Sequence, residues 1–157
     1  MIRRQIAMIL LLIVDIGYIV WGAAAAFAPD HLLGAGGKAI LPAGYEGYSG
    51  ASWSALAAST AGYMATLYRL HGMNCLLFGF MASAITLTAF RHGERWAWWT
   101  LLVGSTLALG SAMSYDRVVN AIGPFEVTEY LGLLMVWGAF AISAPFRASV
   151  RPAPATA

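Results

Sequence analysis

The chain has 157 residues, of which 60% are hydrophobic and only 10% are charged, whereas soluble domains average about 45–50% and about 25%. Its net charge is +2, and because Cys75 is the single cysteine, no intramolecular disulfide can form. The basic residues flank apolar runs and form no patch. This composition excludes a soluble enzyme, a nucleic-acid-binding protein and a disulfide-stabilised secreted domain, and it predicts an integral membrane protein.

Charged residues are spaced along the chain at intervals that match a bilayer. Residues 5–29 carry one charge, at Asp15, and residues 70–90, 96–115 and 130–146 carry none. Since an α-helix rises about 1.5 Å per residue, about 20 residues cross a hydrocarbon core of about 30 Å. We therefore expect an all-α, integral membrane four-helix bundle as one domain over residues 1–147, with spans at about 5–28, 69–90, 96–115 and 124–146.

The first expected span resembles a secretory signal, because it follows two arginines and ends in an A-x-A sequence at residues 26–28. Its apolar run is, however, longer than the roughly 7–15 residues usual for a signal. Asp15 interrupts that run, and Pro29 would directly follow the cut, where a proline ring fits a peptidase poorly. We expect the segment to be retained as a transmembrane helix.

The segment between the first two spans has two parts. Residues 29–54 are rich in glycine and predict a loop with turns. Residues 52–67 carry larger side chains at roughly helical spacing. A single helix over 52–90 would be about 55 Å long, which exceeds the bilayer. We therefore expect a short interfacial helix in this first outer loop, over about 52–67, a bend near Tyr68 to Gly72, and then the second span.

The fourth span is expected to begin at Pro124, because proline suits the first turn of a helix, where its missing N–H costs nothing. Glu126 and Glu129 follow in the first two turns, where the helix dipole favours negative charge. The tail over 148–157 is short and proline-rich, so we expect it to be disordered.

The distribution of lysine and arginine predicts the orientation. With the N-terminus inside, six basic residues lie on the inner side and three on the outer side. This excess favours cytoplasmic N- and C-termini in a multi-pass protein of the cell membrane. The two sets are Arg3, Arg4, Arg91, Arg95, Arg147 and Arg151 inside, and Lys38, Arg69 and Arg117 outside.

Small residues recur every four positions within the expected spans, which lets helix backbones approach closely in lipid. This spacing predicts a compact bundle, and the alternative is that it marks a homodimer seam. The rows are Gly22 and Ala26 in the first span, Cys75, Gly79 and Ser83 in the second, and Gly104 with Ala108 and Gly110 with Ser114 in the third.

Asp15 is the acidic residue that lies deep within an expected span. A charge there costs about 2.5–3.5 kcal/mol on insertion scales. As a functional group it would carry a proton or anchor a ligand. As a structural group it would be protonated or hydrogen-bonded and would lock the bundle. Depth counting offers Tyr18, Ser83, and Ser105 or Thr106 as partners.

Polar side chains gather where the expected topology brings span ends together at the outer face. His71 and Asn74 share a helical face, as do Glu126 and Glu129. A histidine with two carboxylates could bind a divalent metal or shuttle a proton. Alternatively, two arginines pair with carboxylates in a salt-bridge network that closes the bundle. No H-E-x-x-H or C-x-x-C spacing occurs, so no metal or cofactor is assigned. The expected ligand-binding residues are Asp15, Arg69, His71, Asn74, Asp116, Arg117, Glu126 and Glu129.

The run from Tyr68 to Trp99 contains an arginine before a glycine-containing helix and then a basic turn with the sequence Gly-Glu-Arg-Trp-Ala-Trp. It resembles the central segment of small bacterial four-helix membrane proteins of unknown function, loosely grouped as DoxX-like. The resemblance implies an inner-membrane protein that is sometimes linked to redox or quinone-associated systems. It carries no established catalytic residues, so it assigns no role to any position.

Three functional hypotheses follow. The first is a bundle that binds a lipophile, either a lipid or a quinone, or serves as an accessory subunit of a membrane complex. The second is a small membrane isomerase or oxidoreductase acting on a lipid, with His71, Glu126 and Glu129 as acid–base residues. The third is proton or ion movement through Asp15. Expected partners are membrane lipids, a lipophilic ligand or quinone, and a second copy or a membrane-complex subunit.

Overall fold

A computed structural model describes residues 2–34, 37–119 and 124–144. The part of the chain it describes is helical and contains no β-strand, so the all-α prediction is confirmed. Two short 3₁₀ turns lie at Pro29–His31 and Trp53–Ala55, and a π-helix lies at Thr86–Phe90. The α-helices are α1 (Ile2–Phe27), α2 (Ile40–Ser49), α3 (Ala58–Ile85), α4 (Arg95–Val118) and α5 (Pro124–Ser143).

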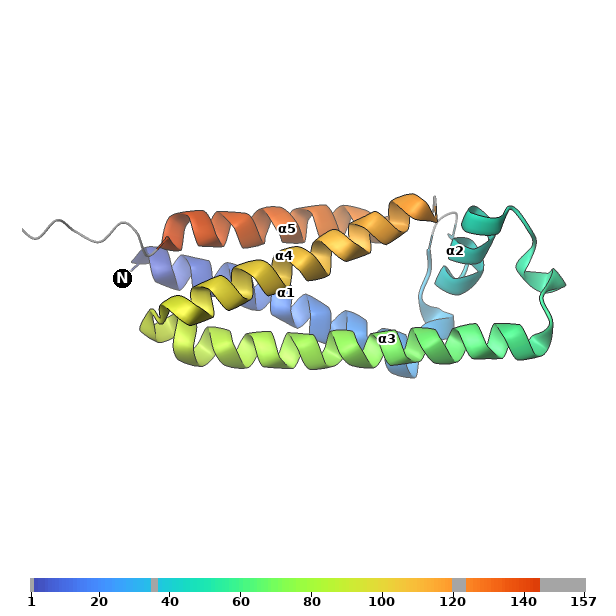
Figure 1. Cartoon of the computed structure of the whole chain (residues 1–157), viewed down its shortest axis with the longest axis horizontal. Helices are drawn as coiled ribbons and strands as arrows, with labels where there is room; N and C mark the ends of the chain where they lie inside the picture. Colours follow the sequence, from blue (N-terminus) through green and yellow to red (C-terminus); the bar gives the residue numbers. More distant parts are fainter. Residues whose placement is uncertain (1, 35–36, 120–123, 145–157) are drawn as a thin grey trace, which may run out of the picture.

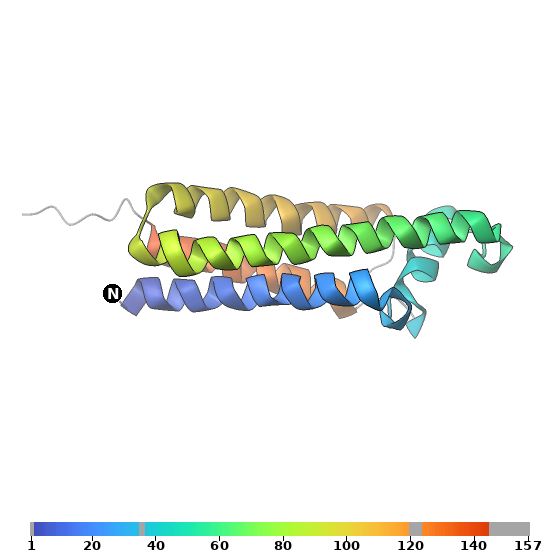
Figure 2. The same cartoon turned by 90° about the horizontal axis from the view of Figure 1, so that it is seen from below.

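Four of the helices, α1, α3, α4 and α5, lie side by side along one long axis, and α2 lies near one end (Figures 1 and 2). We call that end the cap end. The opposite end holds the start of α1 and the short turn between the π-helix and α4, and we call it the basic end. In this bundle α1 packs against α3 and α5, and α4 packs against α5.

Two helical stretches of the described chain are long and apolar enough to cross a membrane. One is α1, and the other is the stretch of 33 residues, Ala58–Phe90, that α3 forms with the π-helix. A shorter apolar helix covers Val127–Ser143. As expected, α5 begins at Pro124. The expected disordered tail, over 148–157, lies outside the described residues.

The predicted bend near Tyr68 to Gly72 is wrong, and so is the separate interfacial helix over 52–67. α3 runs unbroken from Ala58, and with the π-helix it is about 50 Å long. A Cβ at Gly72 would lie 2.5 Å from the backbone nitrogen of Ala26, so this glycine allows α1 to approach and does not bend the helix. An unbroken helix also keeps its backbone groups hydrogen-bonded internally.

A short helix does occur in the first loop, but it is α2, over residues 40–49. Pro42 is tolerated because it lies in the first turn, where a helix has no internal partner for the N–H group. The helix ends at Gly50, whose φ of 68° is the left-handed conformation that glycine adopts readily. Within residues 29–54, Gly50 therefore ends a helix, and the other glycines of the segment do not prevent one from forming.

Glycines bring α1 and α3 into close contact. A Cβ at Gly79 would lie 2.8 Å from the backbone oxygen of Asp15, and one at Gly22 would collide with the backbone nitrogen of Leu76. The prediction of close packing at small residues is confirmed for these two positions. It is wrong for Gly110, where a Cβ would meet nothing within 4 Å.

The apolar core fills the half of the bundle nearest the basic end. Edge-to-face ring contacts hold it together, at 6.1 Å between Phe90 and Phe140 and 5.2 Å between Trp98 and Phe140. The turn before α4 closes with Gly93 at a φ of 85°. The buried residues of this core are Ala7, Leu11, Val14, Ala82, Phe90, Ala97, Leu101, Leu109, Val136, Ala139 and Phe140.

Candidate functional site

Polar side chains from four helices come together in the cap half of the bundle. His71 Nε2 lies 3.4 Å from Cys75 Sγ, in hydrogen-bond contact one turn apart on α3. Electrostatic interactions connect Cys75 and Glu129 with Tyr18, and Asp116 with Tyr68. We call this group the polar cluster. Its members are Tyr18 on α1, Tyr68, His71 and Cys75 on α3, Tyr115 and Asp116 on α4, and Glu129 on α5.

Two hydroxyls of the polar cluster lack a protein partner. The Oη atoms of Tyr18 and Tyr68 are buried, and within the described ranges neither makes a hydrogen bond. The Oγ atom of Ser83, farther along α3 toward the basic end, is in the same state. Leaving a buried donor or acceptor unsatisfied costs about 1–3 kcal/mol. The cluster therefore holds two hydrogen-bonding groups that can serve a molecule from outside the chain.

Phe78 lies where the polar cluster meets the apolar core, against which Phe78 and Tyr18 are both partly buried. Its ring meets the ring of Tyr18 edge to face, with centroids 4.9 Å apart. A Cβ at Gly104 of α4 would lie 3.6 Å from the same ring. The aromatic side chain therefore reaches from α1 to α4 at the edge of the cluster nearest the basic end.

The structure brings together part of the set predicted from the sequence. His71, Asp116 and Glu129 belong to the polar cluster. Arg69 and Asn74 are exposed on α3. The side chain of Glu126 lies outside the described residues, so its expected place in the site stays a prediction.

Arg117 lies on another face of α4, where its Nη2 donates a hydrogen bond of 3.3 Å to Tyr130 Oη. The same face borders a shallow, open cavity of about 280 Å³ at the surface between α4 and α5. Its lining residues are Gly110, Met113, Ser114, Arg117 and Leu133.

Sequence reasoning overlooked the two tyrosines as members of this site. Tyr68, His71 and Cys75 are spaced by three and four residues, so they share one face of a helix. That spacing is visible in the sequence, but the expected bend near Tyr68 separated the first of them from the others. Tyr18 was considered as a partner for Asp15 alone.

Asp15 is fully buried, and its hydrogen-bond partner is Thr86, whose Oγ1 donates to Asp15 Oδ2 at 3.1 Å. The predicted hydrogen bonds with Tyr18, Ser83, and Ser105 or Thr106 are absent among the described contacts, and Thr106 Oγ1 instead accepts a bond from Trp137 Nε1 at 3.1 Å. Thr86 is the first residue of the π-helix. Counting depth along a regular α-helix does not anticipate a partner at this irregular position.

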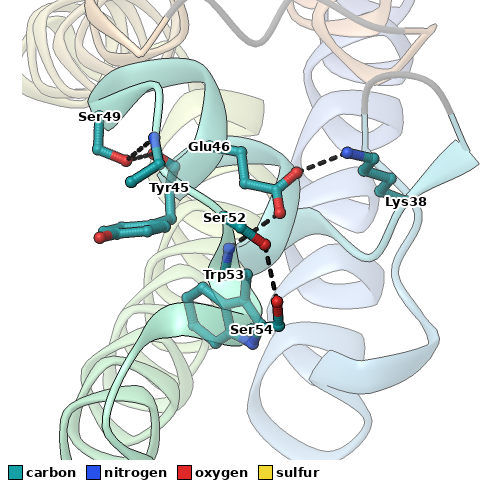
Figure 3. A network of polar contacts seen from close by, with 8 residues as sticks. Lys38, Tyr45, Glu46, Ser49, Ser52, Trp53 and Ser54 are labelled. Atoms are coloured by element: carbon teal, nitrogen blue, oxygen red, sulfur yellow. Dashed lines mark hydrogen bonds and ion pairs between the residues drawn. The ribbon is translucent and has the colours of Figure 1, made fainter.

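A second polar network ties down the cap (Figure 3). Lys38 Nζ lies 2.5 Å from Glu46 Oε2, and Glu46 Oε1 accepts a hydrogen bond of 2.9 Å from the backbone N–H of Trp53. The hydrogen bond from Lys38, together with the one from Trp53, lowers the pKa of the Glu46 carboxyl below its ordinary value. The sequence reasoning did not foresee this pair, because its residues are eight positions apart in a segment expected to be a loop.

The cap also reaches the polar cluster. A Cβ at Gly44 of α2 would lie 3.8 Å from the hydroxyl of Tyr115. Among the described residues, no three His, Cys, Asp or Glu side chains converge in a way that suits a metal ion. The site therefore offers hydroxyl, thiol, imidazole and carboxyl groups beneath a short helix.

Comparisons with protein-family models, with curated proteins and with solved structures find no match to this chain. The resemblance of residues 68–99 to DoxX-like proteins therefore stays a prediction.

Proposed function

We propose that the protein is a four-span membrane bundle that binds an amphiphilic lipophile, a lipid or a quinone, at the polar cluster. The observation that carries this proposal is the pair of buried tyrosine hydroxyls, Tyr18 Oη and Tyr68 Oη, without a hydrogen-bond partner in the described chain. Acceptor oxygens of a bound molecule, such as carbonyl or ester oxygens, would satisfy these hydroxyls, because a tyrosine hydroxyl donates readily to such acceptors.

The length and surface of the helices support four spans. α4 has 24 residues and α5 has 20, which correspond to about 36 Å and about 30 Å. Both lie alongside the two long apolar helices (Figure 2). Each of the four exposes large apolar side chains, which lipid chains would cover. Examples from α1, α3, α4 and α5 are Ile13, Leu77, Leu107 and Leu134.

Charge supports the orientation. Arg3, Arg4, Arg91 and Arg95 lie at the basic end, where α1 begins and the turn leads into α4. The positive-inside rule then places this end in the cytoplasm and the cap on the outer side of a bacterial inner membrane. The polar cluster would lie at the depth of the outer leaflet, within reach of lipid headgroups.

The experiment is to purify the protein in a mild detergent, extract it with organic solvent and identify retained lipophiles by mass spectrometry. We expect Tyr18→Phe and Tyr68→Phe each to lower the retained amount about tenfold, the equivalent of about 1.4 kcal/mol for one lost hydrogen bond. Tyr63→Phe is the matched control, because Tyr63 is an exposed tyrosine of α3, the helix that carries Tyr68.

The same variants separate binding from folding. Removing an unsatisfied buried hydroxyl is expected to leave the ligand-free protein as stable as before, or more stable by up to about 1 kcal/mol. A purely structural role would instead make both variants less stable. Equal retention by Tyr18→Phe, Tyr68→Phe and Tyr63→Phe, or the absence of any retained lipophile, would overturn the proposal.

The acid–base alternative has less support. Of its three residues, His71 contacts Cys75, and Glu129 interacts electrostatically with Cys75 and Tyr18. The side chain of the third residue, Glu126, lies outside the described residues. Ion movement through Asp15 also has little support, because buried apolar residues such as Leu11 and Phe90 fill the core on the side of the basic end.

A further inference from the structure

One side of the bundle is weakly packed. α3 and α4 contact each other at few points, although a short turn joins the π-helix at the end of α3 to α4. α4 instead contacts the π-helix itself, at the basic end. Figure 1 shows α3 and α4 separating from that turn toward the cap end. The other neighbouring pairs, α1 with α3, α1 with α5 and α4 with α5, remain closely packed.

Helical spacing identifies the side chains that face this seam. Gly104 of α4 lies opposite Phe78 of α3, and positions seven and eleven residues after Gly104 share its face. These positions are Ser111 and Tyr115, and both are exposed. The positions that share the face of Phe78, toward the cap end, are Cys75, which is half-buried, and Asn74 and His71, which are exposed.

These polar side chains lie within the depth of a bilayer. Counted from Arg95 at the start of α4, Ser111 lies about 24 Å along the helix, and Cys75 lies about 22 Å from Phe90 on α3. A hydrocarbon core is about 30 Å thick. Ser111 Oγ donates to the backbone oxygen of Ala108, and Cys75 contacts His71, so these groups are partly satisfied within their own helices. A hydroxyl, a thiol and an imidazole each keep further hydrogen-bonding capacity, which lipid chains cannot satisfy. Their gathering on one seam therefore points to an occupant with a polar head.

The cap restricts the route from water. α2 lies over the end of α4, where Gly44 approaches the hydroxyl of Tyr115. Its network of Lys38, Glu46 and Trp53 holds the helix in this position. By contrast, no helix covers the seam between α3 and α4 from the side in either view (Figures 1 and 2).

We infer that the ligand reaches the polar cluster sideways, from the lipid phase between α3 and α4, and that Phe78 limits how deeply its head enters. The occupant is a membrane amphiphile whose head carries hydrogen-bond acceptors. The inference rests on the proposed function, and it specifies the side of entry and the class of ligand.

The native Cys75 reports on this seam, because it is the single cysteine of the chain. In proteoliposomes, we would compare its rate of labelling by a lipid-soluble alkyl maleimide with the rate for a charged, membrane-impermeant maleimide. We expect the lipid-soluble reagent to react at least about tenfold faster. The charged reagent can reach Cys75 only when the cap end opens to water, and this open state would have a population of about 10% or less. Cys75→Ala gives the background.

Ser111→Trp should fill the seam and slow labelling of Cys75 by the lipid-soluble reagent about tenfold. The reagent would then reach Cys75 only in a minor state, of about 10% or less, in which the tryptophan has moved out of the seam. Ser114→Trp is the matched control. Ser114 is also an exposed serine of α4 that bonds a backbone oxygen of its own helix, but it borders the cavity on the side of α5. Normal elution of both variants in size-exclusion chromatography checks that they are folded.

The outcomes are distinguishable. If both reagents label at equal rates, or if Ser111→Trp and Ser114→Trp behave alike, sideways entry is wrong. If both reagents are excluded and crosslinking yields a dimer, a second copy covers the seam and the inference is also wrong. If the labelling pattern holds while no lipophile is retained, the seam is open as inferred and the proposed function fails by itself.

Discussion

The two halves of the bundle differ in what surrounds their buried polar groups. In the basic half, the buried Asp15 has a hydrogen bond from Thr86, Ser83 Oγ has no partner among the described residues, and an apolar core fills the remaining space. In the cap half, the hydroxyls of Tyr18 and Tyr68 have no protein partner, and α3 has separated from α4. The comparison teaches that an apolar core closes the basic half, while the cap half retains two tyrosine hydroxyls that a different molecule can satisfy.

Phe78 marks the border between these halves. Its ring contacts Tyr18, while Ala82 and Phe90, farther along the same helical stretch, are buried in the core. Polar groups that interrupt a close-packed core are destabilising unless they are satisfied. The two unsatisfied tyrosines lie at or beyond the edge of that core, whereas Ser83 leaves one unsatisfied hydroxyl on the other side of Phe78.

The largest expected effect comes from the contact between α1 and α3. Gly22→Ala should destabilise the protein by about 1–3 kcal/mol, because the added Cβ meets the backbone of Leu76 and a backbone cannot rotate away. Gly17→Ala is the control on the same helix, since a Cβ there meets nothing within 4 Å. Thermal unfolding in detergent measures both. If the two variants unfold at the same temperature, the close approach of α1 and α3 is incorrect.

The next effect tests the satisfied polar pair of the basic half. Thr86→Val keeps the shape of the side chain but leaves the buried Asp15 without its donor, at a cost of about 1–3 kcal/mol. Thr88→Val should cost less, because Thr88 is exposed and bonds Ala84 within its own helix. Retention of the lipophile should be unchanged in both. If Thr86→Val loses the lipophile without losing stability, the hydrogen bond to Asp15 serves ligand binding, and the assignment of separate roles to the two halves is wrong.

The smallest effect concerns the cap. Because the pKa of Glu46 is lowered from its ordinary value of 4.5, the carboxylate stabilises the cap above that value. This stabilisation is lost as the pH falls through the lowered pKa. Hydrogen exchange at the backbone N–H of Trp53 should therefore become relatively faster as the pH falls below 4.5. Glu46→Gln should remove this pH dependence and leave the unfolding temperature of the bundle unchanged. A pH dependence that survives in Glu46→Gln would assign it to another group.

The helical class of the fold, and the helices that begin near residues 2, 95 and 124, were predictable because apolar runs bounded by charges and proline have one simple interpretation. The continuity of α3 was not, because bilayer thickness alone suggested a bend. α3 is instead continuous, and Gly72 allows the close approach of Ala26, a contact that depends on three-dimensional packing. The glycines of residues 29–54 were similarly ambiguous, because α2 contains Gly44 and Gly47 and ends at Gly50.

The candidate site was predictable in part. The gathering of His71, Asp116 and Glu129 follows from the order of the spans, which places their ends together. The roles of Tyr18, Tyr68 and Thr86 were not predictable, because they depend on which face each helix turns toward its neighbours. A hydroxyl without a partner is, moreover, a property of the packed structure that no sequence pattern records.

The π-helix over Thr86–Phe90 has a consequence for how this chain tolerates changes in length. A π-turn holds about one residue more than an α-turn. The helical segments before and after it are therefore oriented as they would be in a regular α-helix with one residue fewer. Loss of one of the residues between Thr86 and Phe90 would restore an ordinary α-helix and leave the flanking faces aligned. Loss of a residue elsewhere in α3 would rotate everything beyond it by about 100°. This turn is therefore where the long helix can absorb a deletion.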